Sequence, residues 1–252
     1  MSNSTRRIMP NPFPGMIAPQ SPSVLKVTGN GEQAGTKGTL IAMVLDESGS
    51  MGSVVDQTIE GYNQYIGDQR KNNPNDTYVT LCKFEGGNTR YPYTNSPILN
   101  VPALSRLTFT PAGGTNLLDA IGKTILDTDA HLVKLELAER PSVVITIFTD
   151  GHENASREFT NESIKQMVKD REAKGWAFMF LGANIDAFAV GSQFGMGFAN
   201  TASYSMNNMA ATMSVASATT TRMRGAQAKG LATEAVYESS GYTSAERDAI
   251  KK

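Results

Sequence analysis

Short apolar runs alternate along the chain with segments in which apolar residues recur every three or four positions. The runs occupy residues 39–45, 78–84, 143–148 and 176–181, and they predict strands, the first of which has the continuous apolar character of a strand buried on both faces. Between the first two runs, Val55, Ile59, Tyr62 and Ile66 lie on one face of a predicted helix. Strands that alternate with helices predict a doubly wound, mainly parallel α/β sheet with helices on both faces.

Residues 86–135 predict a loop followed by a helix. Pro92 and Pro97 interrupt residues 86–102, so this segment is expected to be a loop and at best an edge strand. Apolar residues from Leu118 to Leu135 then mark a second helical face, with an interruption expected near residues 127–129.

Two more helices are predicted toward the C-terminal end. Thr160 is a typical N-cap and Gly175 a typical end, so a helix is expected between them. Methionines at helical spacing predict a last helix over residues 206–221. They are expected to fill the core, and the alternative is an adaptable contact surface.

The composition divides the 252 residues into one domain with an appendage at each end. Residues 1–36 form a Pro/Gly-rich N-terminal extension, residues 37–222 form the predicted α/β domain, and residues 223–252 form a tail or short helix.

Charge and cysteine content exclude several classes of protein. The 23 basic and 24 acidic residues give a net charge of −1, which argues against binding nucleic acid or a membrane surface. No apolar run approaches the roughly 20 residues that span a bilayer. The first 22 residues have no run of signal-peptide length, and the single cysteine, Cys82, cannot form an internal disulfide. We therefore expect a cytoplasmic protein.

Oxygen-bearing side chains gather where the predicted strands end. Asp46 closes the first strand, and Ser48 and Ser50 follow it at alternate positions among glycines. Thr115 comes after two glycines at the mouth of a predicted helix, and Asp150 ends another strand. Ligands of doubly wound sheets bind outside the carboxyl ends of the strands, where these side chains would meet if the two strands are adjacent.

Each of these residues also has an ordinary interpretation. Asp-Gly after a strand is usually a turn, and Ser or Thr before a helix is usually a cap. Taken together, however, the five side chains offer hard oxygen ligands without nitrogen or sulfur. That set favours Mg²⁺, Mn²⁺ or Ca²⁺ over zinc or copper.

The pattern Asp46-x-Ser48-x-Ser50, then Thr115, then Asp150-Gly151 resembles the metal-ion-dependent adhesion site (MIDAS) of von Willebrand factor type A (vWA) domains. All five positions match in the family's order, and the resemblance covers residues 37–222. It implies a six-stranded sheet in the order 3-2-1-4-5-6 with a short antiparallel third strand.

The resemblance also implies roles. Ser48 and Ser50 would bind the metal directly, Asp46 and Asp150 partly through water, and Thr115 directly or through water. The expected partner is a protein that donates an Asp or Glu to the metal. Stand-alone domains of this kind occur in bacteria and phages, which implies an AAA-type ATPase or assembly subunits as partners, and a virion-associated location if the protein is phage-encoded.

Five residues near the predicted ligands are candidates for the rim of the site. Glu47 should point away from the metal as a rim charge, or more simply as a solvated acid. The others are Gly114, His152, Asn184 and Asp186. A loop side chain with no special role is the ordinary interpretation of His152.

A non-catalytic interaction module is the expected function, and there are three alternatives. A structural or assembly protein could use the terminal segments to grip neighbouring subunits. A metal-dependent hydrolase is conceivable, although no general base is arranged around the predicted site. Nucleotide binding at Gly122-Lys123-Thr124 is disfavoured because Leu117 replaces the required glycine and the triplet lies inside a predicted helix.

Overall fold

A computed structural model describes residues 37–251, so the predicted extension over residues 1–36 lies outside the described part of the chain. Its centre is a six-stranded sheet in the order β3-β2-β1-β4-β5-β6. All neighbouring strands are parallel except β2 and β3, which are antiparallel. This confirms the predicted fold class and strand order. The strands are β1 (Thr39–Asp46), β2 (Thr77–Glu85), β3 (Asn88–Pro97), β4 (Ser142–Thr149), β5 (Ala177–Ala183) and β6 (Thr201–Tyr204).

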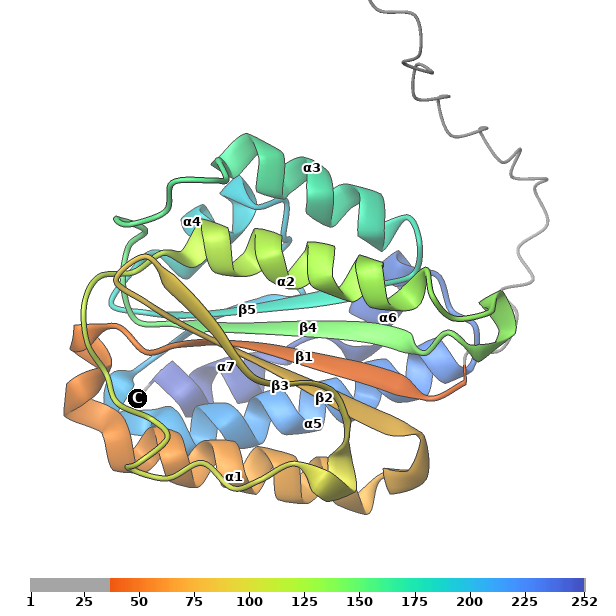
Figure 1. The fold of residues 1–252 in the computed structure, drawn as a ribbon, viewed down its shortest axis with the longest axis horizontal. Helices are drawn as coiled ribbons and strands as arrows, with labels where there is room; N and C mark the ends of the chain where they lie inside the picture. The colour runs from red at the N-terminus through yellow and green to blue at the C-terminus, as the bar shows by residue number, and fades with distance from the viewer. Residues whose placement is uncertain (1–36, 252) are drawn as a thin grey trace, which may run out of the picture. The chain divides into compact units, whose positions relative to one another are not determined.

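Helices cover both faces of the sheet. In Figure 1, α2 and α3 lie on one face, and α1 and α5 lie on the other. The α-helices are α1 (Val55–Lys71), α2 (Leu117–Leu132), α3 (Asn161–Glu172), α4 (Ala187–Gln193), α5 (Met209–Ala228), α6 (Thr233–Ser240) and α7 (Ser244–Lys251). Short 3-10 helices span Gly49–Val54, Pro74–Asp76, Ile98–Asn100, Leu137–Glu139 and Met206–Asn208.

Strand β1 separates two apolar cores. All eight of its residues are buried, because it lies between β2 and β4 with helices on both sides. Ile41, Met43 and Leu45 join the core under α1 and α5. Leu40 and Val44 join the core under α2 and α3. Full burial of each such side chain contributes roughly 1.5–3 kcal/mol, so the strand that delivers Asp46 is firmly held.

The edge strand β3 is longer than the sequence indicated. It spans Asn88–Pro97 and alternates between partly buried and exposed residues, although a loop or a short strand was expected. Register shifts interrupt its pairing with β2 around Tyr93 and Arg90, and Pro92 lies between these two residues. An edge position tolerates this proline because its outer side carries no ladder.

Two helix predictions require adjustment. Helix α2 continues through residues 127–129 without interruption and ends at Leu132, before Leu135. Thr160 caps α3 as predicted, since its side chain accepts a hydrogen bond from the Ser163 amide and the reciprocal bond is also present. The helix itself ends at Glu172, and a turn leads to Gly175.

The C-terminal part of the chain is more structured than expected. The expected boundary at residue 222 falls inside α5, which extends to Ala228, and α6 and α7 follow. Ile250 of α7 belongs to the core beneath α1 and α5. Residues 223–251 are therefore part of the same packed unit, and the predicted short helix describes them better than the predicted tail.

Close helix packing explains the small residues and methionines of α5. Met209 and Met213 are fully buried, which confirms that they fill the core. A Cβ atom on Gly61 of α1 would lie 2.8 Å from the Met213 Cγ. The glycine therefore lets the two helices approach each other. None of the helices within residues 37–251 has the length and apolar character needed to cross a membrane.

Candidate metal centre

The five predicted ligands come from three segments at the end of the sheet where β1 and β4 have their carboxyl ends. Asp46 is the last residue of β1, and Ser48 and Ser50 follow it into the 3-10 helix Gly49–Val54. Asp150 follows β4, the neighbour of β1, so the strand order brings the two acids to adjacent positions.

Asp46 is fully buried and fixes the start of its own loop. Its Oδ1 accepts a hydrogen bond of 2.7 Å from the Ser48 amide. Its Oδ2 accepts one of 2.7 Å from the Thr149 hydroxyl. The carboxylate thereby ties the loop after β1 to the end of β4.

The two serines connect Asp46 to Asp150. The hydroxyls of Ser48 and Ser50 lie 3.1 Å apart, and the Ser50 hydroxyl donates to Asp150 Oδ1 at 2.7 Å. Ser48 and Asp150 are buried, whereas Ser50 is exposed. The cluster therefore reaches the surface at Ser50.

Thr115 approaches the other predicted ligands at Gly151. A Cβ atom built on Gly151 would lie 3.2 Å from Thr115 Oγ1 and 4.0 Å from Ser50 Oγ. Glycine thus leaves a space between hydroxyl groups that come from separate parts of the chain. The Thr115 amide donates to Asn154 Oδ1 at 2.9 Å, and the Thr115 carbonyl accepts from the Asn154 amide at 3.0 Å.

The segment before Thr115 is anchored by its main chain. The Gly113 carbonyl accepts from the Gly49 amide at 3.1 Å, and the Gly114 carbonyl accepts from the Gly86 amide at 2.8 Å. Gly113 has a φ of +63°, and a Cβ there would lie 2.8 Å from the Gly86 Cα. Both the backbone conformation and this close approach require glycine.

Both carboxyl groups of the site are poorly compensated. Burial raises the pKa of Asp46 to about 6, and the charge of Asp150 adds a smaller effect in the same direction. Burial also raises the pKa of Asp150. Among residues 37–251, the buried Oδ2 of Asp150 has no hydrogen-bond partner. The ionised pair is therefore unfavourable unless a positive charge joins it.

These features fit a hard divalent cation. Two carboxylates and three hydroxyls converge, one buried carboxylate oxygen is free, and glycine keeps the intervening space open. Within the described part of the chain, no group of three or more His, Cys, Asp or Glu residues could hold a metal. The candidate centre differs from such sites because hydroxyls make up most of its donors.

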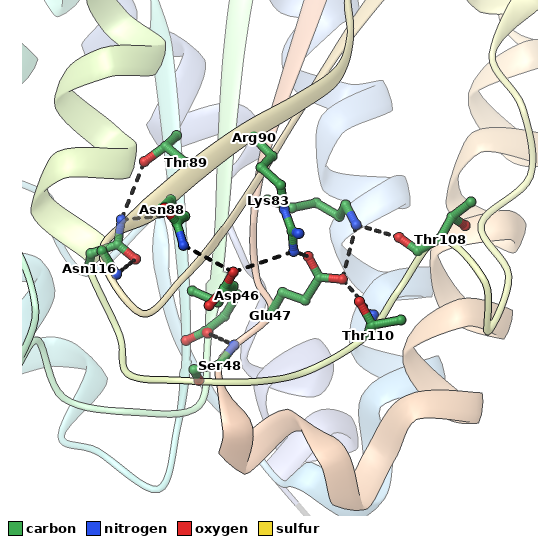
Figure 2. A network of polar contacts seen from close by, with 12 residues as sticks. Asp46, Glu47, Ser48, Lys83, Asn88, Thr89, Arg90, Thr108, Thr110 and Asn116 are labelled. Carbon is green, nitrogen blue, oxygen red and sulfur yellow. Dashed lines mark hydrogen bonds and ion pairs between the residues drawn. The ribbon is translucent and has the colours of Figure 1, made fainter.

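The prediction for Glu47 is wrong in its main point. Its side chain does point away from the ligands, but it is 0% exposed and is neither a rim charge nor a solvated acid. Figure 2 shows Asp46 turned toward Ser48, while Glu47 turns toward Lys83 and Arg90. These cations come from β2 and β3, and their pairing with Glu47 stabilises its burial.

The other rim candidates have mixed positions. Gly114 lies against Asn154, whose Oδ1 would be 2.7 Å from an added Cβ. His152 is an exposed loop residue, in line with its ordinary interpretation. Asn184 and Asp186 are exposed after β5, and Asp186 caps α4 by accepting from the Ala189 amide at 3.0 Å. A role at the rim stays a prediction for all four.

Sequence reasoning missed the acids that fasten the loop after β4. Asp119 of α2 accepts hydrogen bonds from three consecutive amides, those of Arg157, Glu158 and Phe159. Glu153 accepts from the Leu118 amide at 2.9 Å, at the start of α2. An acid in the first turn of a predicted helix is a recognisable signal, but its partners forty residues away are not.

Two further predictions from the sequence agree with the structure. The Gly122-Lys123-Thr124 triplet lies within α2, whereas a phosphate-binding loop requires a turn before the helix. Cys82 is a core residue of β2, and burial raises its pKa to about 12.

Comparison with known proteins identifies the fold. No protein-family model and no curated protein matches the chain. Among solved structures, a variant of the PilB minor pilin from Streptococcus sanguinis aligns with a TM-score of 0.53 and 13% identity over 75% of this chain and 62% of the pilin. Proximal thread matrix protein 1 from the mussel byssus aligns with a TM-score of 0.51 and 14% identity over 72% of this chain and 45% of that protein.

The chain thus spans less than two thirds of either neighbour. A further structure of the mussel protein, with a zinc-occupied MIDAS, has a TM-score of only 0.48, so its metal is a fact about that protein alone. At 13–14% identity these likenesses establish the fold and nothing finer. The described residues have the vWA/Rossmann-like α/β fold.

Proposed function

We propose that this chain is a non-catalytic protein-interaction module that binds its partner through a divalent cation. Asp46, Ser48, Ser50, Thr115 and Asp150 would hold the cation. Mg²⁺ is the first candidate and Mn²⁺ or Ca²⁺ are the alternatives, since all five side chains offer hard oxygen donors. When bound, the cation would supply a positive centre that attracts a carboxylate.

One observation carries this proposal. Two carboxyl groups are buried side by side with raised pKa values, and the buried Oδ2 of Asp150 has no partner among residues 37–251. Buried charges in proteins are normally paired or bound to metals. The three hydroxyls complete a donor set for a cation, and they add no negative charge of their own.

The chain's own residues shape access to this centre. Ser50 and Gly49 are exposed, whereas Asp46, Ser48 and Thr115 are buried. A partner would therefore approach over the loop after β1. An acidic side chain, Asp or Glu, suits a cation held largely by uncharged hydroxyls. An AAA-type ATPase or assembly subunits as partners, and a cytoplasmic or virion-associated location, depend on the sequence resemblance alone.

A binding role is preferred to hydrolysis because of the surrounding side chains. His152 is exposed, and His131 lies on α2 beyond its midpoint. No hydrogen bond within residues 37–251 joins either histidine to the five candidate ligands. The acids that hold the neighbouring loop, Asp119 and Glu153, are occupied by backbone amides.

Calorimetric titration with Mn²⁺ tests the cation site. Outer partners of metal ligands alone change affinity about 10–100-fold, so Ser50→Ala is expected to weaken binding by about tenfold or more. Ser53→Ala is the matched control, because Ser53 is an exposed serine of the same 3-10 helix outside the candidate set. Equal affinities for both variants, or no Mn²⁺ binding by the unmodified chain, would overturn the cation site.

A peptide library with a central Asp or Glu tests the interaction. Binding should require Mg²⁺, disappear in EDTA, and be lost when the central acid becomes Asn or Gln. Peptides that bind equally in EDTA would refute the metal-dependent mechanism.

A further inference from the structure

Glu47 stands between two candidate ligands in the sequence, yet its contacts are with other segments. Its amide donates to the Phe84 carbonyl of β2 at 2.9 Å. Its carbonyl accepts from the Ala112 amide, also at 2.9 Å. The main chain of Glu47 is thus bonded to β2 and to the segment that contains Ala112, without any contribution from its side chain.

The Glu47 carboxylate accepts hydrogen bonds from donors in three segments. Oε1 accepts from Lys83 Nζ at 2.9 Å and from the Thr110 amide at 2.6 Å. Oε2 accepts from Arg90 Nη2 at 2.8 Å. The Lys83 ammonium also donates to the Thr108 carbonyl. Figure 2 shows this network beside Asp46 and Ser48.

The network holds a long irregular loop. Residues 101–116 contain neither strand nor helix, and they lead to α2 and carry Thr115. Glu47 or its partner Lys83 holds this loop at three alternate residues, Thr108, Thr110 and Ala112. A further bond between the same two segments runs from the Gly49 amide to the Gly113 carbonyl.

We propose that Glu47 is a positioning residue that sets the cation affinity of the site without touching the cation. Through Lys83 and Thr110 it fixes the loop that carries Thr115 against the loop that carries the two serines. Ordering this loop before binding removes an entropic cost that the cation would otherwise bear. The inference rests on the proposed function.

A simpler explanation must be separated from this one. The charge of Glu47, adjacent to Asp46, would attract a cation without any positioning. The two explanations make opposite predictions for Lys83→Met, which keeps the carboxylate and removes a neighbouring positive charge. Electrostatic attraction alone predicts tighter Mn²⁺ binding, whereas positioning predicts weaker binding because the link to Thr108 is lost.

The experiment compares four proteins by calorimetric titration with Mn²⁺. We expect Lys83→Met and the double variant Glu47→Gln/Lys83→Met to weaken binding by about tenfold. The double variant leaves the net charge unchanged and removes the buried pair together, so it also serves if the single variant does not fold. Lys123→Met is the matched control, since Lys123 pairs with Glu158 away from this loop, and its affinity should stay within about twofold.

Hydrogen exchange without metal gives an independent measurement. In the double variant, the amides of Thr110 and Ala112 should exchange about tenfold faster, while Val168 in α3 keeps its rate. Unchanged exchange at Thr110 and Ala112, or variant affinities equal to or tighter than that of the unmodified chain, would overturn the role of Glu47. A failure of the unmodified chain to bind Mn²⁺ would instead refute the proposed function.

Discussion

Two clusters of buried acidic residues lie near the end of β1, and they differ in whether basic side chains neutralise their charge. Glu47 is fully buried and is paired with Lys83 and Arg90. Asp46 and Asp150 are also buried, but among residues 37–251 they receive hydrogen bonds only from hydroxyl and amide groups. The neighbouring residues Asp46 and Glu47 thus belong to different clusters. The Glu47 cluster is neutralised by basic side chains, and the cluster of Asp46 and Asp150 is not.

The difference shows where the chain supplies its own counter-charge. A buried carboxylate is costly unless a cation or several donors join it. At Glu47 the positive charges come from Lys83 and Arg90, so this carboxylate needs no ion from solution. Asp46 and Asp150 have no such basic partner among residues 37–251, which is why we assign that cluster to a cation from solution.

The largest expected effect comes from breaking the ion pair between Glu47 and Lys83. Glu47→Ala leaves Lys83, whose side chain is only 6% exposed, without its carboxylate. We expect the free energy of unfolding to fall by about 3–5 kcal/mol, as for other broken buried pairs. Urea denaturation in EDTA measures the change, and a loss below about 1 kcal/mol would show that water or Thr108 can replace the carboxylate.

The next effect is the stabilisation of the cluster of Asp46 and Asp150 by a cation from solution. Mg²⁺ at 100 times its dissociation constant should stabilise the unmodified chain by about 2.7 kcal/mol. Asp150→Asn should remove this stabilisation, because the variant loses one of the two charges of the site. Thermal denaturation with and without Mg²⁺ gives the comparison, and an equal shift in both proteins would place the cation elsewhere.

A smaller effect sharpens the role of the two cations at Glu47. The Arg90 side chain is 48% exposed, so water can replace its hydrogen bond to Glu47. Arg90→Met should therefore reduce the free energy of unfolding by at most about 1 kcal/mol. If urea denaturation shows a loss as large as that of Glu47→Ala, the outer cation is as important as Lys83.

The smallest effect concerns the stability of the cluster of Asp46 and Asp150 in the absence of metal. Asp150→Asn removes a buried charge that repels Asp46, while its side-chain oxygen can still accept from Ser50. In EDTA the variant should have the same urea midpoint as the unmodified chain, or a slightly higher one. A clear loss of stability there would mean that Asp150 already has a favourable partner.

Most of the fold follows from local pattern, and the exceptions have physical causes. Central strands such as β1 and β4 are continuous apolar runs, so periodicity alone locates them. Strand β6 has only four residues, Thr201–Tyr204, and the sequence pattern did not reveal it. Helices α6 and α7 are eight residues each and pack through a few buried side chains, which a composition rich in small and polar residues conceals.

For the candidate site, the sequence predicted which side chains come together better than it predicted their surroundings. The motif spacing and the strand order suffice to bring Asp46 and Asp150 together. The environment of Glu47 depends on Lys83 and Arg90, which lie 36 and 43 residues away. Alternation along a strand tells which way a side chain points, but it does not tell what it meets there.

The proline in β3 limits how copies of this domain can join. Pro92 offers no amide hydrogen to a further strand, and partly buried residues alternate with exposed ones along most of this edge. At the opposite edge, α7 packs against β6, and the Arg247 guanidinium is bonded to the Thr201 carbonyl. A filament built by extending one sheet from copy to copy is therefore disfavoured at both of these edges.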